Sequence, residues 1–262
     1  FAGLDGHRAL GADTAATLTD RSGWTARSGV RLPMGLRVGM SYAVTDANIL
    51  DTRSDRTLRR ETWPDLTATV TSFPVPGGQS LVRSITMSGG FQSITQETAF
   101  GTMAQQRRFE RNDRVPLGLS IVWGGGLSTT YRGSFTRGEG LDPTGSTERN
   151  RENHTLAATA SIRPPAAWGA FLERPFVAST LFQFTADRNC RTTKINAECV
   201  PFLDELIRSL MLRVETTVSR TELRLQLSYT DRRSFVGLQT GSTQFQFGLF
   251  GRFIIADNPL LR

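Results

Sequence analysis

Large apolar residues occupy alternate positions along residues 115–135, on both sides of three consecutive glycines. They are Val115, Leu117, Leu119, Ile121 and Trp123, followed after the glycines by Leu127, Tyr131 and Phe135. Successive side chains of a β-strand point to opposite faces, so this period of two predicts a hairpin that turns at Gly124–Gly126. Each arm has about ten residues, whereas soluble strands have about five or six and a tilted strand crosses a bilayer in about nine to eleven. The hairpin is therefore expected to span a membrane.

The same period recurs along the chain and predicts about eleven strands. They lie near residues 22–32, 36–46, 64–73, 81–93, 115–123, 127–135, 154–163, 176–185, 206–219, 222–230 and 244–256. We expect an all-β, antiparallel, up-and-down transmembrane β-barrel segment over residues 21–262. Bacterial single-chain barrels have an even number of strands. Residues 1–20 are thus expected to be a loop or a weak twelfth strand, and the whole to be part of a larger barrel.

The predicted connections alternate in length. Short ones lie at residues 33–35, 74–80, 124–126 and 219–221, with an intermediate one at 164–175. Long polar ones lie at residues 47–63, 94–114, 138–153, 186–205 and 231–243. Short periplasmic turns and long extracellular loops are typical of outer-membrane barrels. The pattern predicts a bacterial outer-membrane location with a periplasmic C-terminus.

The apolar stripe of each strand needs a covering layer or a lipid environment. No helical pattern is present to cover it, and the opposite stripe is rich in Thr, Ser, Gly and Arg. Mean hydropathy is −0.26, which does not argue against a barrel because alternating strands give a weak hydropathy signal. Six aromatic residues near strand ends are expected at the membrane interface: Trp24, Tyr42, Trp63, Trp123, Tyr131 and Tyr229. The alternative is a soluble sandwich in which these rings are core residues.

The chain carries a net charge of +7, and Lys194 is its only lysine among 31 basic residues. Eight arginines fall on the polar stripes and are expected to face the lumen: Arg27, Arg31, Arg37, Arg132, Arg163, Arg213, Arg224 and Arg252. A basic chain can bind nucleic acid, but it suits equally a barrel that meets anionic lipid head groups. We expect outer-membrane lipid as the partner and no nucleic acid, although codon bias also explains an arginine excess.

Cys190 and Cys199 lie in one polar stretch without a nearby histidine, so they cannot complete a four-ligand zinc site. A loop disulfide in an oxidising compartment is expected, with two free thiols as the alternative.

Catalytic and cofactor motifs are lacking. Only His7 and His154 could act as imidazole bases, and Ser161 lies roughly 20 Å or more from His154 along an extended strand. Residues 124–126 lack the Lys-Ser/Thr of a phosphate loop, and no G-x-S-x-G motif occurs. The sequence therefore predicts no enzyme activity, no metal and no cofactor.

The order "DRVPLGLSIVWGGGLSTTYRGSFTRGEG … STERNRENHTLAATASIR" resembles the C-terminal part of the SprA (Sov) translocon family of the type IX secretion system. "TWPDLTATVTSF" and "SITMSGGFQS" upstream are similar to a Trp-Pro-Asp strand start of that family and to its next strand. "LRVETTVSRTELRLQLSYTDRRS" and "GSTQFQFGLFGRFII" are similar to its closing strands.

The resemblance implies a protein-conducting outer-membrane channel that exports proteins to the cell surface. Its implied partners are secreted protein cargo, a plug protein and a shuttle protein, and it implies no catalytic residue. Two alternatives remain open: a stand-alone porin or lipopolysaccharide-export barrel, and an outer-membrane lipid hydrolase.

Overall fold

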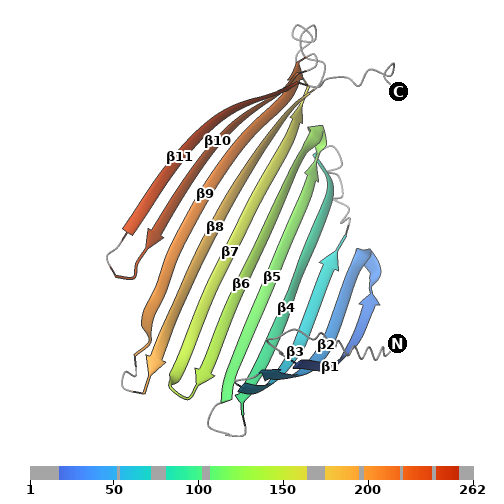
Figure 1. Ribbon diagram of the computed structural model, residues 1–262. Coiled ribbons are helices and arrows are strands. Elements are labelled where there is room, and N and C mark those ends of the chain that lie inside the picture. Colours follow the sequence, from blue (N-terminus) through green and yellow to red (C-terminus); the bar gives the residue numbers. More distant parts are fainter. Residues whose placement is uncertain are drawn as a thin grey trace, which may run out of the picture.

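The computed structural model (Figure 1) describes residues 18–51, 54–71, 81–101, 107–163, 175–194, 198–218, 221–237 and 240–253. Eleven antiparallel strands form one sheet in which every strand pairs only with its neighbours in the sequence. The strands are β1 (Leu18–Arg31), β2 (Leu36–Asp51), β3 (Ser54–Val70), β4 (Val82–Phe100), β5 (Arg107–Trp123), β6 (Leu127–Asp142), β7 (Gly145–Ile162), β8 (Phe176–Thr193), β9 (Val200–Val218), β10 (Thr221–Ser234) and β11 (Thr240–Phe253). The predicted all-β, up-and-down architecture and the number of strands are confirmed.

Two predicted turns are short 3₁₀ segments at the same end of the sheet. They are η1 (Pro33–Gly35), which joins β1 to β2, and η3 (Gly124–Gly126), which joins β5 to β6. Gly125 and Gly126 have φ angles of 76° and 85°, a left-handed conformation that side chains disfavour. The glycine triplet is therefore what allows the reversal between β5 and β6.

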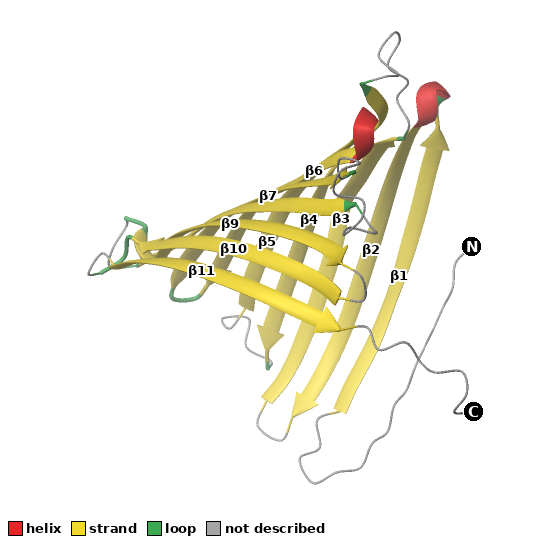
Figure 2. Cartoon of the chain, turned by 90° about the horizontal axis from the view of Figure 1, so that it is seen from above, coloured by secondary structure: helices red, strands yellow, loops and turns green. Residues whose placement is uncertain are grey.

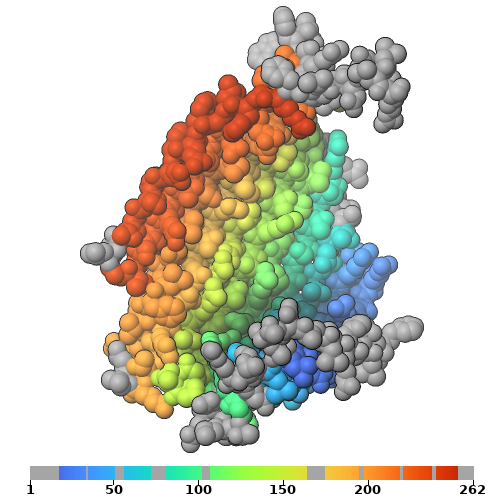
Figure 3. Space-filling model, in the orientation of Figure 1, coloured from blue at the N-terminus to red at the C-terminus, as the bar shows by residue number. Residues whose placement is uncertain are grey.

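The sheet is twisted and curved, with β1 and β11 as its two edges (Figure 2). The surface area of the chain is 19480 Å², against roughly 11,000 Å² for a compact soluble protein of this mass. Side chains of the central and C-terminal strands lie open to view on the face shown in Figure 3. The described residues thus form a single-layered partial barrel rather than a sandwich.

The five segments predicted as long loops are mostly strand, which corrects that prediction. β6 continues to Asp142 and β7 begins at Gly145, and β8 and β9 likewise extend to Thr193 and from Val200. The strands have 14 to 19 residues, so several are longer than a bilayer crossing requires. These extensions are mostly polar and show no sustained apolar period, yet backbone pairing continues because it does not depend on side-chain polarity.

The start of the first strand also differs from the prediction. β1 begins at Leu18, inside the segment predicted as a loop or weak strand. The remainder of that segment, with His7, lies outside the described residues. The predicted connection at 74–80 lies outside them as well, and so does all of the one at 164–175 except Pro175. Among the described residues, no helix is long and apolar enough to span a membrane.

Candidate functional site

The pairing register assigns side chains to two faces, since directly paired residues share a face of the sheet. We call the face that bears Trp24, Leu119 and Leu225 the apolar face, and the opposite one, with Arg27 and Arg132, the polar face. The end of the sheet with η1 and η3 is called proximal, and the other end distal. All eleven strands keep this division from β1 to β11.

The apolar face carries a continuous band of apolar and small side chains with no Asp, Glu or Arg. The band is formed by the alternate, apolar-face side chains within residues 24–30, 36–44, 66–70, 85–91, 115–123, 127–135, 154–162, 176–184, 210–218, 221–229 and 245–253. Most strands contribute about nine residues, which matches the thickness of a hydrocarbon core. Charged residues such as Asp113 and Arg137 begin directly on its distal side.

No second layer of described residues covers this band. Phe245, Phe247 and Leu249 are 68%, 65% and 69% exposed, and Val30 is 58% exposed. The buried apolar residues among those described are Val44, Ala47 and Cys190 alone, and no large side chain is fully buried. An apolar surface of this size is far beyond the few hundred Å² that a soluble monomer tolerates. The band therefore suits contact with lipid.

The six aromatic residues predicted at the membrane interface all lie on the apolar face. Trp24, Tyr42 and Trp63 contact one another in a row at its distal limit, with ring centroids 4.8 Å apart in the tilted first pair and 5.6 Å apart in the edge-to-face second pair. Tyr229 lies two residues before the charged Asp231, and Trp123 ends the band beside η3. Tyr131 is the exception, because it sits midway along its part of the band rather than at a limit.

The side chain of Tyr131 instead contacts His154, a residue that the sequence suggested only as a catalytic base. Its hydroxyl lies 2.8 Å from Nδ1 of His154, whose ring also contacts Phe135 and Phe184. A Cβ at Gly133 would lie 2.6 Å from the Tyr131 hydroxyl oxygen, so glycine leaves the room for this pair. Covering a strand glycine with an aromatic ring is a known way to stabilise a sheet. His154 is thus a structural residue of the apolar face.

The polar face is built from small side chains. A shallow hollow over β4–β7 is lined by Thr86, Ser88, Gly118, Ser120, Thr130 and Arg132. A Cβ at Gly118 would collide with the hydroxyl of Ser88. Serine, threonine and glycine offer too little apolar volume to build a core, and they suit a hydrated surface.

Seven of the eight predicted arginines lie in strands, and all seven are on the polar face. Arg163 follows β7 directly, in phase with Ser161 on the same face. Glu215 Oε1 accepts a hydrogen bond from Arg224 Nε at 2.5 Å, and it forms an ion pair with Arg213, whose Nε lies 2.7 Å away. The others make no ion pair with any described residue.

The distal extension, formed by the strand ends beyond the band, is crossed by ion pairs on both faces. Asp187 lies 3.2 Å from Arg149 and 3.7 Å from Arg151, and Glu205 lies 2.9 Å from Arg232, all on the polar face. Each pair joins two neighbouring strands through residues that lie far apart in the sequence.

Asp142 ends the extension of β6. Its carboxylate accepts bonds from the hydroxyl and the backbone N–H of Thr144, and the pKa of Asp142 is lowered, first by that hydroxyl and then by the N–H. The guanidinium of Arg191, 3.3 Å away, acts in the same direction.

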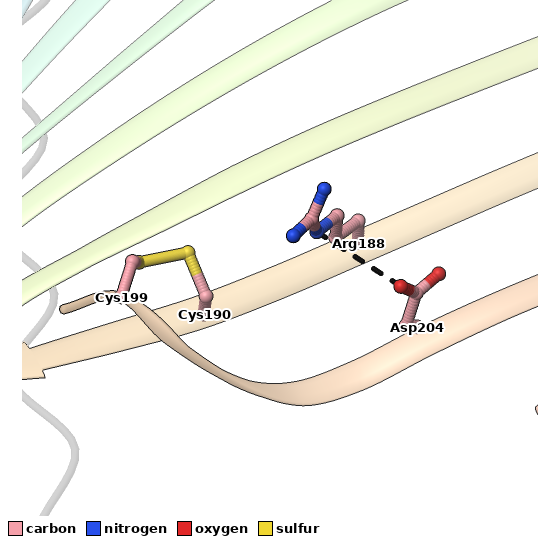
Figure 4. The surroundings of a disulfide bond; sticks show 4 residues. All are labelled: Arg188, Cys190, Cys199 and Asp204. Atoms are coloured by element: carbon pink, nitrogen blue, oxygen red, sulfur yellow. Dashed lines mark ion pairs between the residues drawn. A yellow bond between two sulfur atoms is a disulfide. The ribbon is translucent and has the colours of Figure 1, made fainter. Parts of the chain in front are cut away.

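A disulfide closes the distal hairpin between β8 and β9. Cys190 and Cys199 are joined by an S–S bond with Cα atoms 5.3 Å apart, and Arg188 and Asp204 form an ion pair beside it (Figure 4). The pairing expected from the sequence is present. Glu148 lies close to both sulfur atoms, but bonded sulfurs are not thiolate ligands, so this cluster does not suit a metal.

No protein-family model matches the chain, and no curated protein matches it.

Proposed function

We propose that this chain is part of a protein-conducting outer-membrane β-barrel similar to the SprA translocon of the type IX secretion system. The observation that carries the proposal is the two-faced sheet. Its apolar band is uncovered and about as tall as a hydrocarbon core, while the opposite face is lined by small polar residues and arginine.

The edges of the sheet support a larger barrel. β1 and β11 each have one pairing partner among the described residues, and every residue of β1 is exposed. Unpaired backbone groups in hydrocarbon cost several kcal/mol each, so each edge needs another strand beside it in the membrane. A barrel of more than eleven strands encloses a wide lumen, and wide barrels hold aqueous channels.

The proposed partners are outer-membrane lipid, secreted cargo, a plug protein and a shuttle protein. Lipid follows from the apolar band, and the three proteins follow from the sequence resemblance alone. The proposed orientation places the proximal end and the C-terminus in the periplasm.

Depletion of the full-length protein in its host bacterium tests the function. We expect surface proteins to accumulate in the periplasm, as measured by surface proteolysis and periplasmic extraction, while an unrelated porin assembles normally. Unchanged surface delivery of all exported proteins would contradict the proposal.

Lipopolysaccharide export is a second candidate, favoured by Arg27, Arg31, Arg37, Arg132 and Arg252 on the polar face, which make no ion pair within the described part of the chain. Loss of surface lipopolysaccharide with normal protein export in the same depletion would select it. A lipid hydrolase receives no such support, since His154 lies among aromatic rings on the apolar face.

A further inference from the structure

The register separates charge between the two faces. Sixteen arginines of the strands lie on the polar face: Arg21, Arg27, Arg31, Arg37, Arg56, Arg60, Arg108, Arg114, Arg132, Arg149, Arg151, Arg191, Arg213, Arg224, Arg232 and Arg252. Seven acidic residues with described side chains accompany them: Asp65, Glu110, Asp142, Asp187, Glu205, Glu215 and Glu222. The polar face is therefore strongly positive.

The apolar face has the opposite balance. Its charged residues all lie outside the band, and acidic residues outnumber arginines among them. The arginines are Arg59, Arg107, Arg111, Arg137, Arg188, Arg208 and Arg233, and the acidic residues are Asp20, Asp46, Glu61, Glu97, Asp113, Glu139, Glu148, Glu152, Asp204 and Asp231. Within the strands that the structure describes, the excess of basic residues is thus a property of one face of the sheet.

The imbalance persists at the level of the apolar band, where bulk solvent is farthest away. At this level the polar face has three acidic residues with described side chains, Asp65, Glu215 and Glu222. It has seven arginines, which are Arg27, Arg31, Arg37, Arg132, Arg213, Arg224 and Arg252. Glu215 is shared by Arg213 and Arg224, and Asp65 accepts a hydrogen bond from Ser41 at 2.6 Å. Arg27, Arg31, Arg37, Arg132 and Arg252 are exposed and make no ion pair with any residue in the described part of the chain.

Arg31 and Arg37 are directly opposite each other in the β1–β2 ladder. Like charges at directly opposed positions destabilise a strand pair, and an anion between the two guanidinium groups removes that cost. Arg27 lies on the same face of β1, four residues away, so three guanidinium groups follow one short stretch of this surface.

Small residues leave these guanidinium groups accessible. Gly29 and Gly39 pair between the positions of Arg27 and Arg31, and a hollow beside them is lined by Arg27, Gly39, Ser41, Thr67 and the acidic Asp65. Arg132 is flanked by Gly118 in the neighbouring strand. A molecule that moves along the polar face thus meets exposed cations and hydroxyl groups.

We infer that the polar face selects anionic substrates, namely polypeptides with an acidic surface, over basic ones. The inference rests on the proposed function, because it requires this face to line the conduit. Walls of one charge sign with low-dielectric surroundings focus the field and concentrate ions of the opposite sign, as rings of Arg or Lys do in anion-selective pores.

Ion selectivity of the full-length protein in planar bilayers tests the inference. Across a KCl gradient we expect a reversal potential whose sign indicates that the pore prefers chloride to potassium. The substitutions Arg27→Glu, Arg31→Glu and Arg37→Glu together should shift this potential toward potassium selectivity, and Arg132→Gln should shift it less in the same direction. Arg137→Glu is the matched control, because Arg137 shares β6 with Arg132 but lies on the apolar face.

Potassium selectivity of the unmodified pore would overturn the inference while leaving a pore in place. A shift of the reversal potential by Arg137→Glu as large as that by the polar-face substitutions would also overturn it. Absence of any conductance would count against an open conduit, and export in cells then decides the matter. One cargo protein with its surface made acidic or basic is followed to the cell surface, and we expect the acidic form to be exported faster. Equal or reversed rates would overturn the inference, and no export of either form in cells that contain the protein would contradict the proposed function.

Discussion

The band and the distal extension belong to the same strands but treat their two faces differently. In the band, one face is apolar and uncovered while the other carries arginine, serine and threonine. In the distal extension both faces are charged, and ion pairs cross both of them. The difference teaches that side-chain alternation marks the part of the sheet in which only one face is apolar, whereas strand pairing extends beyond that part.

The largest expected effect is from a charge placed on the apolar face of the band. Leu119→Arg and Leu225→Arg, each in the middle of its strand's part of the band, should lower the free energy of unfolding by roughly 2–4 kcal/mol. Urea titration of the full-length protein in lipid measures the change.

Matched controls probe the polar face and the distal extension. Thr69→Arg and Thr86→Arg on the polar face, and Leu141→Arg on the apolar side of the extension, should be nearly neutral, because each arginine would reach water. Equal costs at all five positions would remove the distinction between band and extension.

The disulfide should matter next, and only in the extension. Cys190 and Cys199 are separated by 9 positions in the sequence, and replacing both by serine opens the loop that they close. From the loop entropy we expect the free energy of unfolding to fall by about 2–3 kcal/mol. Faster amide exchange confined to the distal ends of β8 and β9 is the expected result. Loss of protection across the band in the same variant would show that the two regions are not independent.

A smaller effect is expected at Tyr131. Tyr131→Phe removes the hydrogen bond to His154 and should cost about 1 kcal/mol of unfolding free energy. Tyr229→Phe is the control, because no hydrogen bond joins the Tyr229 hydroxyl to a described residue. Equal losses for the two variants would show that the Tyr131–His154 contact contributes nothing of its own.

The smallest effect concerns pH and the β6–β7 hairpin. The pKa of Asp142 is lowered from 3.8 by the hydroxyl and N–H of Thr144, so its contribution is present above that pH and is lost as the pH falls through the lower, folded value. Amide protection at Gly145, which donates to Asp142, should fall with acidification below about 3.8, and Asp142→Asn should abolish the dependence. An unchanged dependence in that variant would assign the effect to other carboxylates.

The sequence predicted the parts of the fold that have an apolar period or a local turn signal. Alternation located all eleven strands, and Pro33–Gly35 and Gly124–Gly126 marked two turns, because an apolar period and turn-forming residues are local signals. The same alternation placed the eight predicted lumen-facing arginines and the six predicted interface aromatic residues on opposite faces.

Other features depend on which residues become neighbours across strands. The strand pairing beyond the band was missed because residues 138–142 and 145–153 are polar apart from Leu141 and resemble loops. The Arg149–Asp187 pair joins residues 38 positions apart, and the Tyr131–His154 contact joins residues 23 apart. Only the register brings these groups together, and no single-strand pattern encodes it.

The central claim is that the apolar face meets lipid while the polar face meets water, and accessibility along β5 tests it most directly. Single cysteines at positions 117–122 of the full-length protein carry a nitroxide label, with Cys190 and Cys199 protected by their disulfide. Positions 117, 119 and 121 should be reached by a lipid-soluble relaxing agent, and 118, 120 and 122 by a water-soluble one. Equal access of the water-soluble agent to all six positions would contradict the account.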